Sequence, residues 1–393
     1  MPCSRWGWRR SSPRSRATRC ALSSRPESAD VVIVGGGAVG TATAYHLARL
    51  GVTDVVVCER DTLGSGSTGK SAGGIRLQFG DELNVRLSLR SLAELERFEE
   101  LTGQSIDLVQ PGYLFLLDDE ADAGVFRQAL AVQQALGVPS RELTPAEARE
   151  LVPQLELDGV VAATYCPRDG HMTADAVVRG YATAAATRGV RIHQSCPVTA
   201  IRSGAGGRIV GVDTARGPIA TDTVICAAGA WSAEVGRLVG VELPVEGIPR
   251  WLHFTPTDGG LPQRLPLTID FSSGFYFHRE GTGLVFGGRE PRIEGLAEHV
   301  GRRLPVLLEL PVTSSWWGYY EVSPDENAIV GEAAAPNRFL YATGFSGHGF
   351  QQAPAVGEHL AELVAGVPPT LDLSPFDVAR FAAGHERRET FVV

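Results

Sequence analysis

The chain has 393 residues, of which 44% are hydrophobic and 21% are charged, a composition typical of a globular protein with about two domains. Its formal net charge of −9 argues against nucleic acid as a partner, because nucleic-acid-binding proteins usually carry a basic face. No run of about 18 apolar residues indicates a membrane span. The 6 cysteines form no C-x-x-C pair, so we expect neither a metal site nor a disulfide framework.

The first 26 residues differ in composition from the rest of the chain. They contain seven arginines, and the first acidic residue is Glu27. A segment rich in arginine and serine but without acids resembles an organellar transit peptide. We favour instead a disordered leader, or a start codon placed too early, because the segment has no clear apolar face. We expect residues 1–28 to lie outside the fold, and a cytoplasmic location unless this segment directs the protein to an organelle.

A β-α-β unit is predicted next, within residues 31–59. The apolar run 31–34 predicts a parallel strand that is buried on both faces. Residues 41–50 have helical spacing of apolar side chains, and residues 54–58 predict a second buried strand. Two strands and a helix within so few residues form one complete dinucleotide-binding unit.

Three glycines and one acid in this unit predict a dinucleotide site. Gly35, Gly37 and Gly40 fit G-x-G-x-x-G, which brings backbone N–H groups and a helix N-terminus to a pyrophosphate. Glu59 follows the second strand, where a carboxylate accepts hydrogen bonds from a ribose hydroxyl. An acid at this position disfavours the 2′-phosphate of NADP.

Further along the chain, helical and strand patterns of apolar residues alternate. Helices are predicted at residues 81–103, 120–136, 144–151, 174–188 and 352–365, and strands at 111–117, 190–193 and 223–226. Residues 208–225 predict a hairpin that runs into the strand 223–226. Short strands separated by Gly, Pro and Ser turns over residues 245–290 indicate an antiparallel sheet.

Three motifs in order resemble those of the D-amino-acid oxidase superfamily of FAD-dependent oxidoreductases. They are the glycine fingerprint, the segment 67–76 (Ser-Thr-Gly-Lys-Ser-Ala-Gly-Gly-Ile-Arg) and the segment 344–350 (Gly-Phe-Ser-Gly-His-Gly-Phe). The resemblance covers residues 30 to 368 and is greatest to sarcosine oxidase, glycine oxidase and the dye-linked proline dehydrogenase subunits.

The resemblance implies an α/β fold in which a Rossmann-type FAD-binding domain carries an inserted, mainly antiparallel-sheet substrate domain. The FAD-binding domain is predicted to be discontinuous, in residues 29–80, 155–235 and 320–370. The substrate-binding domain is predicted in residues 81–154 and 236–319.

The resemblance also implies one noncovalent FAD, with Ser67 and Thr68 along its pyrophosphate or ribityl chain and Gly73 and Gly74 close to its ring. The N-terminus of the last helix would stabilise the negative charge of the reduced flavin. The residues predicted to bind the cofactor are Gly35, Gly37, Ala38, Val39, Gly40, Glu59, Arg60, Ser67, Thr68, Ser71, Ala72, Gly73, Gly74, Val198, Ala228, Gly229, Trp231, Gly344, Gly347, His348, Gly349, Phe350 and Gln351.

Arg76 aligns with the arginine that binds the substrate carboxylate in sarcosine oxidases, and the planar fork of a guanidinium suits that role. A structural ion pair is the alternative role for Arg76. The other predicted active-site residues are Tyr276, His278, Arg289, Tyr320 and His348. For His278, a place at the edge of the sheet is the alternative.

The chain departs from the family pattern at four positions. The lysine that helps sarcosine oxidases to activate oxygen aligns with Val285, and a second family lysine aligns with Gln351. The cysteine that links FAD covalently is replaced near Gly318, and the carboxylate-binding arginine of glycine oxidases aligns near Tyr320. These departures favour noncovalent FAD, a changed carboxylate pocket and an acceptor that need not be oxygen. Lys70, the only lysine, could take the missing lysine's place, but a solvated loop lysine is the favoured interpretation.

The resemblance implies that the protein oxidises a small amine or amino acid, with an N-substituted glycine such as sarcosine favoured. Hydride would pass from the C–H next to the nitrogen to flavin N5, and water would hydrolyse the resulting imine. The electron acceptor would be oxygen, or else a quinone or a partner protein in a proline-type dehydrogenase. A catalytically silent flavoprotein that acts as an assembly factor is the alternative outside enzymology.

Overall fold

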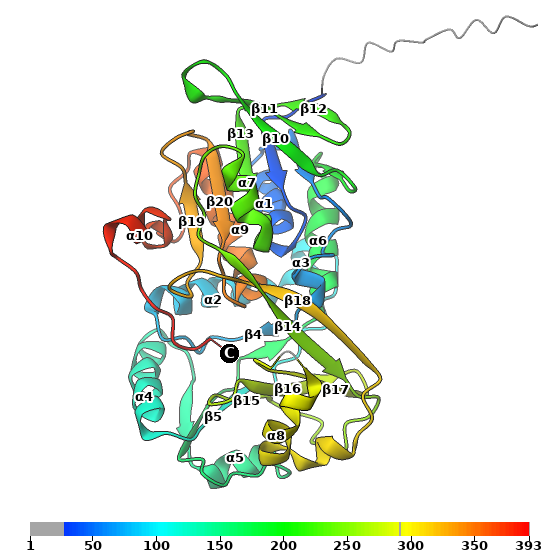
Figure 1. The fold of residues 1–393 in the computed structure, drawn as a ribbon, viewed down its shortest axis with the longest axis vertical. Helices are drawn as coiled ribbons and strands as arrows, with labels where there is room; N and C mark the ends of the chain where they lie inside the picture. The colour runs from blue at the N-terminus through cyan, green and yellow to red at the C-terminus, as the bar shows by residue number, and fades with distance from the viewer. Residues whose placement is uncertain (1–26, 291, 393) are drawn as a thin grey trace, which may run out of the picture.

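The computed structural model describes residues 27–290 and 292–392, which build two large β-sheets and the helices that cover them (Figure 1). The leader predicted for residues 1–28 lies outside the described residues except for Glu27 and Ser28, which form the short strand β1. No helix in the described part of the chain is long and apolar enough to cross a membrane.

A six-stranded sheet, five of whose strands run parallel, forms the first half of the molecule. Its order is β19-β20-β13-β2-β3-β9, and only β19 runs antiparallel to its neighbour. The strands are β2 (Val31–Val34), β3 (Val55–Cys58), β9 (Arg191–His193), β13 (Thr223–Cys226), β19 (Ile329–Glu332) and β20 (Phe339–Thr343). Strands β2 and β3 are apolar, β13 is apolar apart from Thr223, and all three are fully buried because both faces of the sheet are covered. The prediction of a parallel β-α-β unit is thereby confirmed.

Helices cover one face of the six-stranded sheet, and a smaller sheet covers the other. The helices of the first face are α1 (Ala38–Arg49), α2 (Glu82–Leu95), α3 (Phe98–Thr102), α6 (Ala174–Ala186) and α9 (Gly349–Ala365). On the second face lie α7 (Ser232–Arg237) and a four-stranded sheet of β1 (Glu27–Ser28), β12 (Gly217–Ala220), β11 (Ile209–Thr214) and β10 (Val198–Ser203). The predicted hairpin of residues 208–225 is therefore β11 and β12, which lie in the small sheet, while β13 belongs to the large one.

Glycines allow α1 and α9 to cross at very short range. A Cβ atom on Gly357 of α9 would lie 2.7 Å from the backbone nitrogen of Thr43 and 2.8 Å from Ala42 in α1. Helix α1 in turn begins tightly against the end of β2, because a Cβ on Gly40 would lie 2.0 Å from the carbonyl oxygen of Gly35. Both helices begin on the same side of the sheet, at the carboxyl ends of its parallel strands (Figure 1).

An eight-stranded, mainly antiparallel sheet forms the second half. Its order is β18-β14-β17-β16-β15-β5-β7-β6, and only β15 and β5 pair in parallel. The strands are β5 (Tyr113–Leu117), β6 (Arg141–Leu143), β7 (Ala162–Cys166), β14 (Glu246–Phe254), β15 (Leu267–Asp270), β16 (Phe275–Glu280), β17 (Gly283–Gly287) and β18 (Ser314–Val322). The predicted antiparallel sheet over residues 245–290 is found within it.

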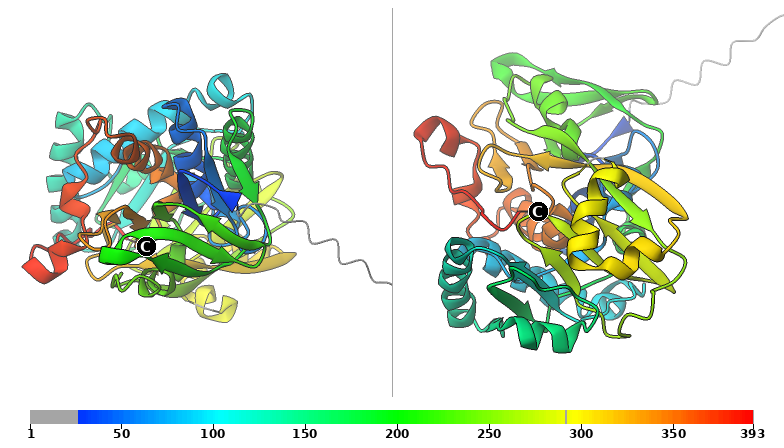
Figure 2. Two further views of the ribbon diagram at one scale, coloured as in Figure 1. Left: turned by 90° about the horizontal axis from the view of Figure 1, so that it is seen from above. Right: turned by 60° about the horizontal axis from the view of Figure 1, so that its bottom comes forward.

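Helices also pack against both faces of the second sheet. Helix α4 (Glu120–Ala135) contacts one face, whereas α5 (Pro145–Leu151) and α8 (Ile293–Arg303) contact the other, as the rotated views show (Figure 2). A two-stranded sheet of β4 (Gly74–Ile75) and β8 (Gly170–His171) lies where the chain passes between the two halves. The exact division of the chain into two domains stays a prediction. Strand β7, whose residues fall within the predicted FAD-binding segment 155–235, lies in the eight-stranded sheet.

Several helices differ from the prediction in their bounds. Helix α1 begins at Ala38, three residues before the predicted start at residue 41. The helix expected over residues 81–103 ends at Leu95, and a separate turn of helix begins at Phe98. The break turns the ring of Phe98 onto α6, where it packs edge-on against Tyr181 with 4.8 Å between ring centroids. The last helix begins at Gly349, three residues earlier than predicted, and so its first turn is made by the glycine-rich segment itself.

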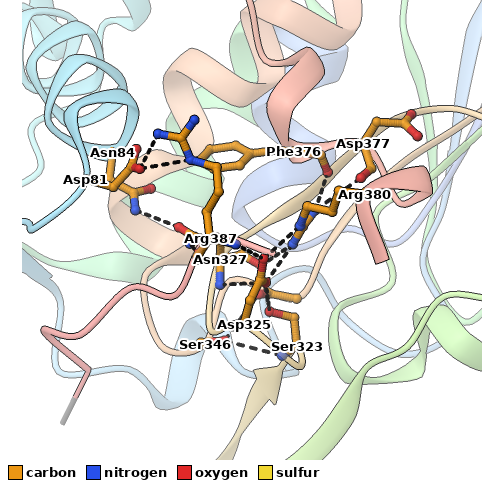
Figure 3. A network of polar contacts seen from close by, with 11 residues as sticks. Asp81, Asn84, Ser323, Asp325, Asn327, Ser346, Phe376, Asp377, Arg380 and Arg387 are labelled. Carbon is orange, nitrogen blue, oxygen red and sulfur yellow. Dashed lines mark hydrogen bonds and ion pairs between the residues drawn. The ribbon is translucent and has the colours of Figure 1, made fainter. Parts of the chain in front are cut away.

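The C-terminal segment after α9, for which no element was predicted, is tied to the fold by a buried polar network. Helix α10 (Ala379–Ala383) carries Arg380, whose guanidinium forms a 2.8 Å ion pair with Asp325, and both side chains are buried. Burial raises the pKa of Asp325, but hydrogen bonds from Arg380 and Arg387 outweigh it and hold that pKa below its ordinary value. Figure 3 shows how this network joins the segment to the loop after β18 and to the start of α2.

The crossing of α1 and α9 can be tested by adding one methyl group. We expect Gly357→Ala to lower the free energy of unfolding by about 1–3 kcal/mol, because backbone atoms of α1 occupy the space that the methyl group needs. Gly124→Ala in α4 is the matched control, since a Cβ there meets nothing within 4 Å. It should raise the free energy of unfolding by about 0.5–1 kcal/mol through helix propensity alone. An equal increase in the free energy of unfolding for both variants, measured by urea denaturation, would contradict the tight crossing.

Candidate functional site

One cavity of about 410 Å³ lies between the two sheets, within the range of about 300–1,000 Å³ that is usual for ligand sites. It extends from the turn after β2 to the strands β14 and β18. Of the residues predicted to bind the cofactor, those that line it are Gly35, Gly37, Ala38, Val39, Glu59, Arg60, Ser67, Thr68, Ser71, Ala72, Gly73, Gly74, Val198, Ala228, Gly229, Trp231, Gly347, His348, Gly349, Phe350 and Gln351. Gly40 and Gly344 do not line it.

The turn between β2 and α1 explains why glycines are needed at its first and third positions. Gly35 has a φ of +113°, and a Cβ there would lie 2.2 Å from the carbonyl oxygen of Ala227. Gly40 lies behind the turn, in the helix–strand contact described above. Between them, Gly37 and Ala38 present the backbone to the cavity. This is the division of roles expected of a G-x-G-x-x-G turn.

Glu59 lies beside this turn and is held by backbone N–H groups. Its Oε2 accepts a 2.7 Å hydrogen bond from Gly36 N, and its Oε1 accepts one of 2.8 Å from Asp61 N. A carboxylate has about four acceptor positions, so acceptor capacity remains for a ribose hydroxyl. Nearby, the guanidinium of Arg60 stacks on the ring of Trp231, 3.6 Å from its centroid.

The loop of residues 64–71 forms another wall of the cavity. Thr68 Oγ1 accepts a 3.1 Å hydrogen bond from Ala38 N and so ties the loop to the start of α1. The neighbouring Ser67 Oγ is buried and has no hydrogen-bond partner among the described residues. A buried hydroxyl without a partner is costly, and here it borders the cavity. A phosphate or ribityl oxygen of FAD would satisfy it.

Two helices begin at the cavity without a side-chain cap. The N-cap residues are Gly37 for α1 and His348 for α9, and neither helix has an acid in its first turn. Free N–H groups and the helix dipole make each N-terminus favourable for an anion. The two positions suit the pyrophosphate and the reduced ring of FAD, so the residues present fit this cofactor.

The far end of the cavity forms a chamber lined by tyrosines, arginines and a histidine. We call the set Arg76, Tyr113, Arg250, Tyr276, Tyr320 and His348 the chamber residues. The backbone comes close to the aromatic rings here. A Cβ on Gly74 would lie 1.9 Å from the Tyr113 hydroxyl, and one on Gly347 would lie 2.5 Å from the Tyr320 ring.

Residues 30–363 match the protein family described as FAD dependent oxidoreductase (DAO). The chain belongs to this family. The predicted family, the FAD cofactor and the enzyme class are thereby confirmed, and so is the mixed α/β fold. The noncovalent attachment of FAD and the role of each residue stay predictions.

Three relatives within the family illustrate the similarity. Human mitochondrial sarcosine dehydrogenase is 30% identical over 91% of this chain and 42% of its own length, so the chain spans less than half of that protein. FAD-dependent oxidoreductase domain-containing protein 1 of Xenopus laevis is 34% identical over 91% of this chain and 83% of its own. The crystal structure of L-proline dehydrogenase from P. horikoshii has a TM-score of 0.86 and 33% identity, over 92% of this chain and 100% of that one.

Arg76, predicted to bind a substrate carboxylate, is buried and engaged by the protein itself. Its terminal nitrogens donate to the carbonyl oxygens of Gln78 and Phe391, and Nη2 also lies 2.8 Å from Nε2 of His348. The guanidinium lies over the ring of Phe79, 4.1 Å from its centroid. These contacts agree with a structural role for Arg76, but one made by hydrogen bonds to carbonyl oxygens and not by the ion pair named as the alternative.

His348 is neutral in this arrangement. A guanidinium has no acceptor, so Nε2 of His348 must accept from Arg76 and the ring proton resides on Nδ1. Burial, together with the charge of Arg76, lowers the pKa of His348 well below its ordinary value. His348 therefore adds a dipole to the chamber and no charge.

Two predicted active-site residues lie outside the cavity. His278 is fully buried in β16, and its ring nitrogens face the carbonyl oxygens of Arg279 and Ala72 at 2.8 and 3.1 Å. It thus supports the cavity wall at Ala72 from behind. Arg289 is exposed, and its hydrogen bonds go to the carbonyl oxygens of Ser272 and Val392.

Among the cavity-lining residues that sequence reasoning missed are Tyr113, Arg250 and Glu321. For Arg250 and Glu321, the available signal was the alternation of inward and outward side chains along the strands β14 and β18 that carry them. Which of the two faces meets the cofactor layer depends on register between strands that are far apart in sequence. Residue Arg250, for instance, pairs with Gly318.

Glu321 is a carboxyl group without a cationic partner among the described residues. Burial raises its pKa to about 8, and hydrogen bonds from the Thr343 hydroxyl and the Phe345 backbone offset only part of this. Thr343 Oγ1 lies 3.3 Å from its Oε2. Glu321 is therefore mainly protonated at neutral pH.

This pKa predicts a pH dependence of stability. The folded pKa lies above the ordinary value of 4.5, so the stabilising contribution is complete below about pH 4.5 and is lost as the pH rises through about 8. We expect the melting temperature of the wild type to fall, relative to that of Glu321→Gln, between pH 5 and pH 9. Glu298→Gln, at an exposed position of α8, is the control and should follow the wild type. Parallel curves for the wild type and Glu321→Gln would contradict a raised pKa.

Proposed function

We propose that the protein oxidises a small secondary α-amino acid, such as an N-substituted glycine or a proline-type substrate. The observation that carries the proposal is that the chamber, at the ring end of the cavity, is lined by two arginines and three tyrosines and by no ionised acid. A small molecule with a carboxylate and a neutral amine matches this lining.

The relatives support this substrate class. Sarcosine dehydrogenase is named for sarcosine, which is N-methylglycine, and the P. horikoshii enzyme is named for L-proline. Both molecules are secondary α-amino acids, with one carboxylate next to the carbon that loses hydrogen. Because the chain spans only part of sarcosine dehydrogenase, the activity is carried over as a proposal.

The electrostatics of the chamber favour the reactive form of such a substrate. Arg76 and Arg250 are cations, and the tyrosine hydroxyls are neutral because burial raises the pKa of Tyr113, Tyr276 and Tyr320. Nearby positive charge stabilises a carboxylate and lowers the pKa of an amine. The substrate nitrogen would thus lose its proton on binding, without a base supplied by the protein.

FAD, when bound, supplies the hydride acceptor for the C–H next to the substrate nitrogen. The residues of the chain position the reactants and exclude water. Gly73 and Gly74 present backbone without side chains to the cavity, and Tyr276 and Tyr320 also line it. The tyrosine hydroxyls can orient the substrate.

We further propose that electrons leave to an acceptor other than oxygen. Val285, which takes the place of the family's oxygen-activating lysine, is buried in the apolar cluster between β17 and its neighbours. Gln351, at the second lysine position, accepts a 2.6 Å hydrogen bond from Arg76 N. Lys70 lines the cavity but is exposed. No lysine of the described residues lies buried at the chamber.

The direct test is an anaerobic screen of the FAD-loaded protein, in which the loss of flavin absorbance reports reduction. We expect bleaching with sarcosine, proline or a larger N-carboxymethyl amine, and slower or no bleaching with the corresponding amines without a carboxylate. In air, turnover should reduce an artificial dye faster than it releases peroxide. No bleaching with any of these acids, together with a stable protein partner in pulldown, would favour the silent assembly factor instead.

A further inference from the structure

The chamber holds two arginines, and their surroundings differ. Arg76 is 4% exposed, and both of its terminal nitrogens already donate to backbone carbonyl oxygens, those of Gln78 and Phe391. A carboxylate that gripped this guanidinium in the usual bidentate way would have to displace those carbonyls. Displacement of the Phe391 carbonyl would also disturb the ring of Phe391, which stacks on Phe126 at 3.9 Å.

Arg250 has no comparable partner. It extends from β14 over the ring of Tyr320, with 5.3 Å between its guanidinium carbon and the ring centroid. Among the described residues no carboxylate lies within ion-pair distance of it, and its Nε is buried without a hydrogen-bond partner. Its Nη1 donates one long hydrogen bond, 3.3 Å, to the carbonyl oxygen of the adjacent Pro249.

A buried donor without a partner costs free energy, and a cation without a counter-ion at a cavity wall attracts an anion. We propose that Arg250, and not Arg76, binds the carboxylate of the substrate, with the Tyr320 hydroxyl as a neighbouring donor. Arg76 is then a positioning residue, which joins the C-terminal segment to His348 at the start of α9. This assignment rests on the proposed function and specifies how the site selects amino acids over simple amines.

The surroundings of Gly318 agree with an anion at this place. Gly318 pairs with Arg250 across the sheet, and a Cβ on Gly318 would lie only 2.6 Å from Cβ of Lys70. Lys70 also lines the cavity and forms no ion pair within the described residues. Two cationic side chains therefore flank one glycine, and the acid on the same strand, Glu321, is mainly protonated.

Binding of an unreactive acid tests the assignment without turnover. Pyrrole-2-carboxylate resembles a cyclic secondary amino acid but is aromatic and resists oxidation, and pyrrole is its matched probe without a carboxylate. The FAD-loaded protein is titrated with each while the flavin absorbance is followed. For the wild type we expect saturable binding of the acid and much weaker binding of pyrrole.

Substitutions then locate the carboxylate. Arg250→Met should weaken binding of the acid by about 10- to 100-fold, the effect expected for lost charge-assisted hydrogen bonds, and leave pyrrole binding unchanged. Arg250→Lys should recover part of the loss, because it keeps the charge but not the planar fork. Arg208→Met, at an exposed arginine outside the cavity, is the matched control and should bind as the wild type does.

Two outcomes separate this assignment from the proposed function. If Arg250→Met binds the acid within about twofold of the wild type, or if the wild type binds acid and pyrrole equally, the assignment is wrong. If the wild type binds the acid through Arg250 yet oxidises no secondary amino acid, the assignment stands and the proposed function fails. With an oxidised substrate, Arg250→Met should raise KM far more than it lowers kcat.

Discussion

The close crossing of α1 and α9 is the constraint on which the rest of the site depends. Gly357 removes the side chain that would hold the helices apart, and Gly40 lets α1 start directly against β2. As a result, two uncapped helix N-termini border a single cavity, at Gly37 and at His348. Each suits an anion, and a dinucleotide with a redox-active ring has negative charge at both places.

The second layer depends on this geometry. The eight-stranded sheet faces the ring end of the cavity with β14 and β18, whose inward side chains include Arg250 and Tyr320. The C-terminal segment closes the arrangement from the outside. It is bound to the core through Arg380 and Asp325, and it ends with the Phe391 carbonyl on Arg76. One arginine is thus committed to the fold, while the other is left for a ligand.

The β-α-β unit could be predicted because its information is local. Buried apolar strands, glycines at fixed spacing and an acid after the second strand lie within residues 31–59, and each has one structural meaning. The strands β10 and β19 and the break after Leu95 were missed, since they depend on contacts with distant elements. The start of α9 was also missed by three residues, and the residues 349–351 that form its first turn line the cavity.

The candidate site shows the same limit at single residues. The lining of the cavity by Gly35, Glu59 and Ser67 agrees with their predicted place near a cofactor. The surroundings of Arg76 could not be foreseen, because the carbonyl that it binds lies 315 residues away in sequence. Arg250 carried no motif at all, and only the register of β14 against β18 places it in the chamber.

A crystal structure of the FAD-loaded protein tests the central claim most directly. The account predicts one FAD, with its pyrophosphate at the backbone N–H groups of residues 37–39 and its ring between Gly73, Gly74 and the start of α9. The flavin should be unlinked to any side chain. A ring outside the chamber, a reversed cofactor or a pyrophosphate away from α1 would contradict the claim that the two helix N-termini together build the site.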